Sequence, residues 1–224
     1  MRIEDAGENS VIAWFADHAS IEVNEGVVAT CNSLEQSMGD ALVDLVPSYA
    51  SLLVIFDPFK THHEEVRQRL LDAFESSNTS KTIAKLIELP VLYGEAFGPD
   101  ITRIAENAGI TEAQVAELHQ SVEYRVYAIG FAPGFAYLGE VDTKLATPRL
   151  ETPRQIVPKG AVAIADRQTA VYPSQSPGGW NLIGLCPTRL IDPTAKSPMS
   201  ITVGDRIRFV EIDESQYLSL GGEL

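Results

Sequence analysis

Apolar and polar positions over the first 90 residues follow two periods in turn, the short period of strands and the longer period of helices. Strands are indicated by four apolar or alternating runs, at residues 10–15, 43–49, 51–56 and 81–93. Helices are indicated over residues 27–45 and again from His62, where Val66, Leu70 and Phe74 recur every fourth position. The resulting order, β-α-β-β-α-β, predicts a split βαβ sandwich over about residues 5–90.

A short helical connector is predicted next. Asp100 opens a helix that Gly109 closes, since glycine is common directly after a helix end. Thr111 caps a second helix, but the capping box is expected to be incomplete, because Gln114 supplies the amide rather than the carboxylate version. His119 lies at the end of that helix, where the helix dipole favours the charged form of the imidazole. From its position alone, a surface or capping histidine is the favoured interpretation.

The pattern changes again after residue 122, where short strands follow one another between proline and glycine turns. Six strands are expected, at residues 123–131, 160–166, 169–173, 180–187, 188–193 and 205–212. Their close spacing is typical of a β-barrel or β-sandwich. In the last strand Arg206 and Arg208 alternate with Ile207 and Phe209, so the arginines are interpreted as solvated strand residues.

Composition and charge narrow the domain organisation and the function classes. With 45% hydrophobic and 21% charged residues, the 224-residue chain has the composition of an ordinary soluble globular protein. Residues 1–121 carry 20 acidic and 7 basic side chains, and prolines are concentrated after them. Two domains are therefore expected, residues 1–90 and residues 91–224, the second consisting of the connector and the β-barrel. Because no basic stripe is present to displace counterions from phosphates, nucleic-acid binding is not expected.

Neither a membrane span nor a signal peptide is expected. The sequence has no run of about 18 apolar residues, and its start lacks the basic and apolar regions of a signal peptide. The expected location is the cytoplasm. Cys31 and Cys186 lie far apart, with no Cys or His at metal-ligand spacing, so buried free thiols are expected rather than a metal site or a disulfide.

Residues 127–187 hold the strongest functional signal. Proline fixes φ and glycine reaches backbone angles closed to other residues, so each Pro-Gly pair specifies a turn and the stretch is expected to form a defined surface. Aromatic side chains alternate there with the polar groups Arg149, Arg154, Gln168 and Ser176. This combination is typical of a pocket that orients a small polar ligand.

Several catalytic templates are absent or incomplete. Neither phosphate-binding glycine motif, GxxxxGK[ST] or GxGxxG, occurs in the chain. The tandem histidines at 62 and 63 do not complete the HExxH zinc motif, because Arg67 stands where the second histidine is needed. Ser176 is not part of a GxSxG elbow and is interpreted as a turn residue or hydrogen-bond donor rather than a nucleophile.

Three ordered motifs resemble one known family. They are GFAPGFAYLG at 130–139, PRLETPRQIVPKGAVAIA at 148–165 and QTAVYPSQSPGGWNLIG at 168–184. Together with LPVLYGEAFGPD and AELHQSVEYRVY upstream and VGDRIRF downstream, they resemble the B subunit of the prokaryotic 5-oxoprolinase. That family includes the sporulation-kinase inhibitor KipI and is often labelled allophanate hydrolase subunit 1. The likeness is close over about residues 88–210 and covers the N-terminal part in outline.

The resemblance implies an α+β protein with a ferredoxin-like N-terminal domain and a cyclophilin-like β-barrel C-terminal domain. It also implies a part in the ATP-dependent opening of 5-oxo-L-proline to L-glutamate. This lactam hydrolysis is shared with two partners, a KipA-like protein (the C subunit) and a protein of the LamB/YcsF type (the A subunit). The chain is expected to be inactive alone. ATP, together with Mg²⁺, is then a co-substrate of the complex rather than a covalently bound cofactor.

The motifs also suggest site residues. The resemblance implies that Arg149 and Arg154 bind carboxylate or phosphate, while Gln168, Tyr172 and Ser176 orient the amide. The remaining expected substrate-binding positions are the apolar walls and the glycines between them, Phe131, Phe135, Tyr137, Gly178, Gly179 and Trp180. A structural role competes with each assignment, since the arginines can pair with acidic neighbours and the aromatic residues can form barrel core.

Four further positions are singled out by the same resemblance. His119 matches the histidine of the family's LHxS segment and becomes a candidate for acid-base catalysis or ligand contact. Asp166 and Ala170 replace the glycines of the family's AGxQTG, and Lys159 stands where a small residue is usual in VPAG. Because glycine allows close backbone approach, these departures bear on the identity of the substrate.

Two other classes of function remain open. One is a KipI-like regulatory protein that holds a sensor histidine kinase inactive, which an acidic N-terminal domain suits by engaging a basic partner. The other is a component of urea or allophanate metabolism, which rests on the family label and on a related module within urea carboxylase. A lone chain without a biotin-carrier or amidase segment does not complete that chemistry. An assembly of identical chains is compatible with each of these functions.

Overall fold

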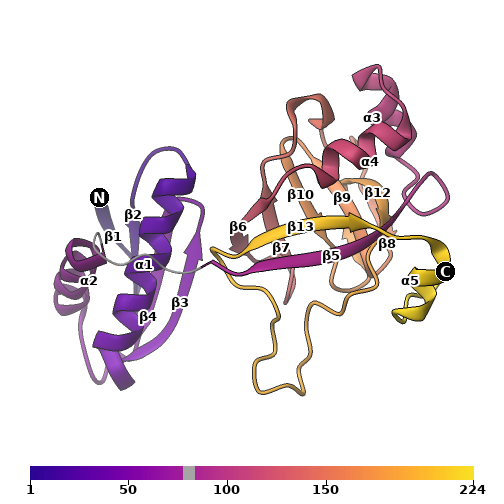
Figure 1. Ribbon diagram of the computed structural model, residues 1–224. Coiled ribbons are helices and arrows are strands. Elements are labelled where there is room, and N and C mark those ends of the chain that lie inside the picture. Colours follow the sequence, from indigo (N-terminus) through magenta and orange to yellow (C-terminus); the bar gives the residue numbers. More distant parts are fainter. Residues whose placement is uncertain (78–83) are drawn as a thin grey trace. The chain divides into compact units, whose positions relative to one another are not determined.

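The computed structural model describes residues 1–77 and 84–224 of the chain (Figure 1). These residues form two compact units, Met1–Ala84 and Lys85–Leu224. The sequence pattern predicts the boundary after residue 90, inside the strand β5, Leu86–Tyr93. All of β5 lies in the second unit, so the boundary is about six residues earlier than predicted. The start of the predicted strand, residues 81–83, lies outside the described residues.

The N-terminal unit is a four-stranded antiparallel sheet with two helices. Its elements are β1 (Arg2–Gly7), β2 (Ser10–Trp14), α1 (Ile21–Met38), β3 (Leu42–Ser48), β4 (Ser51–Phe56) and α2 (His63–Ser77). The strand order is β1-β2-β4-β3. Since β4 is antiparallel to both β2 and β3, the segment from β2 through α1 to β3 is a split βαβ unit with β4 inserted between its strands.

One face of this sheet holds the core of the unit. Alternate strand residues such as Val54 and Phe56 are buried against Leu34 of α1 and Leu70 of α2. Because every second residue of a strand points to the same face, both helices cover one side of the sheet. The apolar spacing read from residue 62 onward therefore predicted the buried face of α2 correctly.

The predicted strand order is wrong at both ends of the N-terminal unit. The structure adds β1, which pairs with β2, and assigns Leu86–Tyr93 to the other unit. The sequence of β1, RIEDAG, is largely exposed and polar, so it carries no apolar signal. The ferredoxin-like domain is therefore not confirmed, because the strand predicted as its last element, Leu86–Tyr93, belongs to the other unit.

The helix predicted over residues 27–45 is displaced. The side chain of Ser20 accepts a hydrogen bond from the backbone N–H of Val23, at 3.2 Å, and starts α1 six residues earlier. Gly39, at φ 55°, ends the helix, and the chain then enters β3. No helix among the described residues, including the 18 residues of α1, is long and apolar enough to cross a membrane.

The second unit contains a closed seven-stranded barrel (Figure 1). Besides β5, its strands are β6 (Tyr124–Ile129), β7 (Ala136–Gly139), β9 (Ala161–Ala165), β10 (Gln168–Val171), β12 (Asn181–Leu185) and β13 (Arg206–Glu211). They close in the order β10-β7-β6-β13-β5-β12-β9. Outside the barrel, β8 (Arg154–Val157) and β11 (Ser176–Gly178) pair as a two-stranded ribbon. The predicted β-barrel is thus confirmed.

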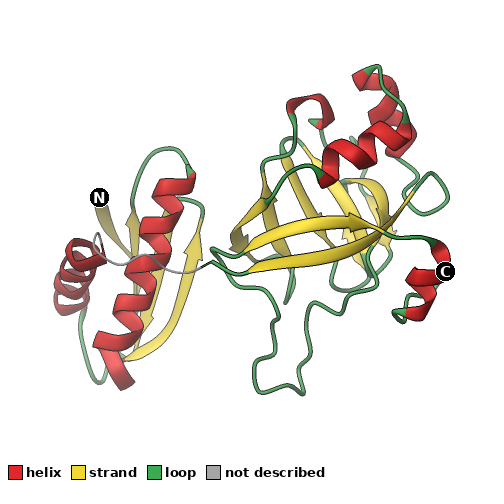
Figure 2. Cartoon of the chain, in the orientation of Figure 1, coloured by secondary structure: helices red, strands yellow, loops and turns green. Residues whose placement is uncertain are grey.

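The details of the barrel differ from the pattern at three places. The barrel strand β7 is not among the predicted strands. The run at residues 188–193 is not a strand but part of the long loop between β12 and β13, visible in Figure 2. The strand β5 joins the barrel by pairing in parallel with β13. In β13, Ile207 and Phe209 are buried, whereas Arg206 and Arg208 both contact Glu123 on the surface. The interpretation of these arginines as solvated strand residues is confirmed.

Three short helices accompany the barrel, α3 (Ile101–Ala108), α4 (Glu112–Gln120) and α5 (Glu214–Ser219). Gly109 closes α3 at φ 66° and Thr111 caps α4, both as predicted. The capping box predicted to be incomplete is reciprocal, because the Gln114 side chain accepts from the backbone N–H of Thr111. Ile104 of α3 and Val115 of α4 are buried in the barrel core. Cys31 and Cys186 are buried free thiols, also as predicted.

Candidate functional site

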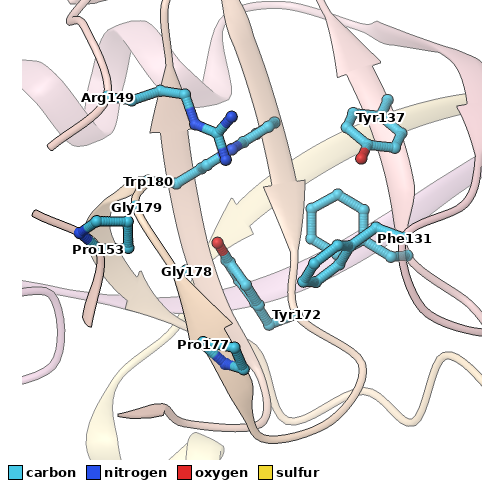
Figure 3. A pocket seen from close by; sticks show the side chains of 10 residues that line it. Phe131, Tyr137, Arg149, Pro153, Tyr172, Pro177, Gly178, Gly179 and Trp180 are labelled. Carbon is cyan, nitrogen blue, oxygen red and sulfur yellow. The ribbon is translucent and has the colours of Figure 1, made fainter. Parts of the chain in front are cut away.

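A small pocket opens on the barrel unit, within the proline- and glycine-rich stretch (Figure 3). Its volume is about 210 Å³. The lining residues come from the loop after β6, from β7, from the loop before β8, from the end of β10 and from the segment around β11. They are Phe131, Phe135, Tyr137, Arg149, Pro153, Tyr172, Pro177, Gly178, Gly179 and Trp180. Seven of the predicted substrate-binding residues and Arg149, predicted to bind a carboxylate or phosphate, thus lie together.

The walls of the pocket are aromatic. Phe135 lies at the centre of the cluster and makes edge-to-face contacts with Tyr172 and Trp180, with ring centroids 5.2 Å and 5.8 Å apart. A Cβ atom at position 178 would collide with the hydroxyl of Tyr172. Only glycine therefore fits at Gly178, because the Tyr172 ring needs the space that a Cβ would take.

Arg149 is the only charged residue among those that line the pocket. Figure 3 shows its guanidinium on one side of the cavity, with Phe131 and Tyr137 on the other. Within residues 1–77 and 84–224, the guanidinium makes no hydrogen bond or ion pair. An exposed guanidinium with unused donors next to apolar walls is suited to bind a carboxylate in bidentate geometry.

The backbone on both sides of Arg149 is anchored. The backbone N–H of Leu150 donates to the carbonyl of Gly179, at 2.7 Å, and the side-chain amide of Asn181 donates to the carbonyl of Pro148, at 3.0 Å. The arginine therefore projects from a fixed segment, which reduces the entropy that ligand binding has to overcome.

Asn181 is a positioning residue that the sequence did not reveal. Its side chain is completely buried, donates also to the carbonyl of Ile164 at 3.0 Å, and accepts from Arg103 at 3.0 Å. A buried amide in a strand has to satisfy its donors and acceptor within the protein. The available signal was a single polar residue inside the apolar run WNLIG.

Arg154, the other predicted anion-binding arginine, does not line the pocket. Its guanidinium donates to a carboxylate oxygen of Asp100 at 2.8 Å and to the carbonyl of Trp180 at 3.5 Å. The second oxygen of Asp100 accepts from the backbone N–H of Leu182, at 2.7 Å. Asp100 and Arg154 together hold the backbone at Trp180 and Leu182, and the Arg154 guanidinium is engaged in this internal ion pair.

The Tyr172 hydroxyl is the polar group inside the aromatic wall. Burial raises the pKa of this phenol, while Arg149, a backbone hydrogen bond from Trp180, and Arg154 lower it. Burial dominates, so the phenol stays protonated at neutral pH and remains able to donate a hydrogen bond.

His119 lies in the barrel core and not at the pocket. Its side chain is completely buried and stacks on the Phe209 ring, with centroids 4.4 Å apart. Nδ1 lies 2.7 Å from the Tyr93 hydroxyl and Nε2 lies 2.8 Å from the Thr169 hydroxyl. Because Thr169 donates its own proton to the carbonyl of Ala163, Nε2 carries the proton and Nδ1 accepts from Tyr93.

The interpretation of His119 as a surface or capping histidine in its charged form is therefore wrong. Burial lowers the pKa of His119 from 6.5 to about 3, which outweighs the helix dipole. The imidazole does not line the pocket, so the structure gives it no contact with a ligand there.

Stability is expected to depend on pH through His119. In the unfolded chain the imidazole binds a proton below about pH 6.5, whereas in the folded chain it stays neutral down to about pH 3. Its stabilising contribution is complete above pH 6.5 and falls by about 1.4 kcal/mol per pH unit below it. Urea unfolding at several pH values between 7 and 5 checks this. The variant His119→Gln, which does not titrate, is expected to show a shallower slope, and equal slopes would contradict the assignment.

Gln168 and Ser176 do not line the pocket either. Gln168 lies on β10 opposite Gly139 of β7, and Ser176 lies on β11 opposite Val157 of β8. The hydroxyl oxygen of Ser176 is buried and is the only side-chain polar atom in the described part of the chain that is buried without a partner. Pro177 and Gly178, which follow Ser176 on β11, line the cavity, whereas the serine itself does not.

The three departures from the family pattern also lie outside the pocket lining. Asp166 has φ 51° in the tight turn between β9 and β10, so glycine suits this position because of its backbone angle. Ala170 is completely buried in the cluster that backs the aromatic wall, and Lys159 is an exposed turn residue. The lining around Arg149 is therefore not changed directly by these substitutions.

Known proteins similar to the chain include 5-oxoprolinase B subunits and, more distantly, a putative urea carboxylase of Emericella nidulans, which is 25% identical over 121 residues, 53% of this chain and 10% of that protein. A family model described as carboxyltransferase domain, subdomain C and D, matches residues 1–201. The 5-oxoprolinase B subunit of Bacillus subtilis (strain 168) is 34% identical over 230 residues, covering 96% of this chain and 95% of that protein. The 5-oxoprolinase B subunit of Escherichia coli O157:H7 is 42% identical over 169 residues, covering 75% and 78% respectively.

A solved structure supports the fold. The crystal structure of TTHA0988 is 36% identical and aligns with a TM-score of 0.79, covering 92% of this chain and 40% of that chain. The chain thus spans less than half of that protein's length. The barrel, its pocket and the attached α/β unit define a protein of the carboxyltransferase C and D class. Within that class, the chain belongs to the family of 5-oxoprolinase B subunits. By name, these relatives are subunits of an enzyme complex.

Proposed function

We propose that the chain is a subunit of an ATP-dependent 5-oxoprolinase and that its pocket holds 5-oxo-L-proline. The observation that carries this proposal is the pairing of Arg149 with aromatic walls in a cavity of about 210 Å³ that no acidic side chain lines. Such a site suits a small, flat ring that bears one carboxylate. A cationic ligand would instead meet an uncompensated guanidinium.

The residues around the cavity have distinct tasks in this proposal. Arg149 binds the carboxylate of 5-oxoproline in bidentate geometry, and the Tyr172 hydroxyl donates to the lactam oxygen. The aromatic rings cover the apolar faces of the ring and exclude water from the amide. A lactam is a poor electrophile, and phosphorylation of its oxygen by ATP activates the carbonyl carbon towards water. The C–N bond of the resulting adduct then breaks, which frees the amine and leaves an acyl phosphate. A second water hydrolyses this acyl phosphate to the carboxylate of glutamate and inorganic phosphate. The chain thus orients the amide for a reaction that other subunits complete.

The pocket does not fit ATP. A triphosphate with Mg²⁺ needs several cations or donors around the phosphates and oxygen ligands for the metal. The pocket lining offers one arginine and no carboxylate, and its volume is below the range of about 300–1,000 Å³ usual for larger ligands. We therefore propose that the nucleotide binds to a partner, either the KipA-like protein or the LamB/YcsF-type protein, and that this chain is inactive alone.

Reconstitution tests the proposed function. The purified chain is mixed with its KipA-like and LamB/YcsF-type partners, 5-oxoproline and ATP, and the release of glutamate is measured. Turnover is expected only when all three chains are present. A complete mixture without 5-oxoproline-dependent ATP hydrolysis would rule the proposal out.

A second candidate function is favoured by the charge of the N-terminal unit. Residues 1–84 contain 14 acidic and 5 basic side chains. An acidic surface of this kind attracts a basic partner, so a KipI-like inhibitor of a sensor histidine kinase is the alternative. An affinity pull-down that recovers such a kinase but no KipA-like protein would favour the alternative over the hydrolase function.

A further inference from the structure

Phe131 combines two unusual properties at the rim of the pocket. Its side chain is 62% exposed although it is a large aromatic group, and its φ angle is 68°. The left-handed region is unfavourable for a residue with a bulky side chain, because Cβ approaches the backbone carbonyl. A residue held there is unusual enough to call for a physical explanation.

The surrounding loop keeps Phe131 in this conformation. The backbone N–H of Gly130 donates to the carbonyl of Phe135 at 3.0 Å, that of Phe135 donates to Ala132 at 3.0 Å, and that of Ala132 donates to Gly130 at 2.8 Å. These bonds close the short connection between β6 and β7, which are adjacent strands of the barrel. The barrel and the hydrogen-bonded turn therefore fix the direction of the Phe131 side chain.

Packing does not account for this conformation. The Phe131 ring makes edge-to-face contacts with Phe135 at 5.3 Å and with Tyr172 at 6.5 Å between centroids, but most of its surface is open. Burial of so little apolar area offsets only a small part of the backbone strain. Figure 3 shows the ring at the cavity, on the side opposite Arg149.

Building on the proposed function, we infer that Phe131 is a specificity-determining residue that covers the face of a ring-shaped ligand whose carboxylate is held by Arg149. The rim then favours a closed, uncharged lactam ring over an open-chain amino acid. Ring opening replaces the neutral amide by an ammonium group and a second carboxylate. The second carboxylate is disfavoured beneath an aromatic ring, because the face of the ring is negative and displaces the water that would solvate the charge. Phe131 thus strengthens binding of 5-oxoproline and leaves the open-chain product, glutamate, weakly held.

A pair of variants separates the ring from the backbone. Phe131→Ala and Phe131→Gly both remove the ring, but only glycine adopts φ 68° without strain. Isothermal titration of the full chain with 5-oxoproline and with L-glutamate is the binding measurement. Both variants are expected to bind 5-oxoproline about 10-fold more weakly than the unmodified chain, with glutamate binding changed less than about twofold. The Tm of Phe131→Gly is expected to exceed that of Phe131→Ala by about 2–4 °C.

A matched control uses the other non-glycine residue with positive φ in the described part of the chain, Asp166 at φ 51°. Asp166 does not line the pocket, so Asp166→Gly is expected to leave both affinities unchanged. If both Phe131 variants bind 5-oxoproline as tightly as the unmodified chain does, the inference fails while the proposed function stands. If the unmodified chain does not bind 5-oxoproline, the proposed pocket and the inference fail together. Equal Tm values for the two Phe131 variants would refute the strain argument.

Discussion

Replacing Arg149 by alanine is expected to weaken binding of 5-oxoproline to the chain by about 100-fold, or about 2.7 kcal/mol. The guanidinium is the only charged group of the pocket lining and has no protein partner of its own within the described residues. Its removal therefore takes away the carboxylate contact without unfolding a network. Arg149→Lys keeps the charge but loses the bidentate geometry, so a loss of about 10-fold is expected. Isothermal titration calorimetry measures both effects.

Two controls make the Arg149 result specific. Arg167→Ala removes an exposed arginine that is paired with Glu140 and lies outside the pocket lining. The affinity of this variant for 5-oxoproline is expected to equal that of the unmodified chain. The second control is 2-pyrrolidinone, which has the lactam ring but no carboxylate. Its weak binding is expected to be the same with and without Arg149. Unchanged binding of 5-oxoproline by Arg149→Ala would show that the carboxylate is held elsewhere.

Replacing Gly98 by alanine is expected to lower the free energy of unfolding of the barrel unit by about 3 kcal/mol. A Cβ at this position would overlap backbone atoms of Ile183 and Gly184 in β12. Backbone atoms within a barrel strand cannot move aside as the end of a flexible side chain can. The collision also separates Asp100 from Leu182, whose backbone exchanges two hydrogen bonds with it.

Urea unfolding followed by tryptophan fluorescence measures this loss. The chain has two tryptophans, Trp14 and Trp180, so a Trp14→Phe background leaves Trp180 as the reporter of the barrel unit. Gly109→Ala is the matched control, because Gly109 has φ 66° but a Cβ added there would meet no atom within 4 Å. Its expected cost is only the backbone strain, about 1 kcal/mol. Equal costs for the two variants would mean that the close approach of Gly98 to β12 is unimportant.

The pocket could be located from the sequence because its shape is specified locally. Pro133-Gly134 forms a turn, as the sequence predicts, whereas Pro177 and Gly178 lie in the strand β11, so the turn predicted there is wrong. Proline still limits φ in both segments. The aromatic residues next to these restricted segments are therefore presented together. Eight of the twelve predicted site residues line one cavity for this reason.

The two arginines show where local sequence is not sufficient. Arg149 and Arg154 each follow a Thr-Pro dipeptide, so their local contexts are nearly the same. Their roles differ because Asp100, 54 positions before Arg154, pairs with Arg154 and leaves Arg149 open to the pocket. His119 of α4 is a similar case, because its hydrogen-bond partners in the core, Tyr93 and Thr169, lie on the barrel strands β5 and β10.

By itself, the sequence determined the two-part organisation, the all-β character of the second part, the ends of α3, the start of α4 and the stretch that forms the pocket. These properties depend on short-range patterns, namely periodicity, capping residues and turn residues. Tertiary structure alone decided that β5 joins the barrel, that β1 completes the N-terminal sheet, and which polar side chains are paired internally. Strand pairing and side-chain pairing depend on residues distant in the chain, whose proximity the fold creates, so no local pattern specifies them.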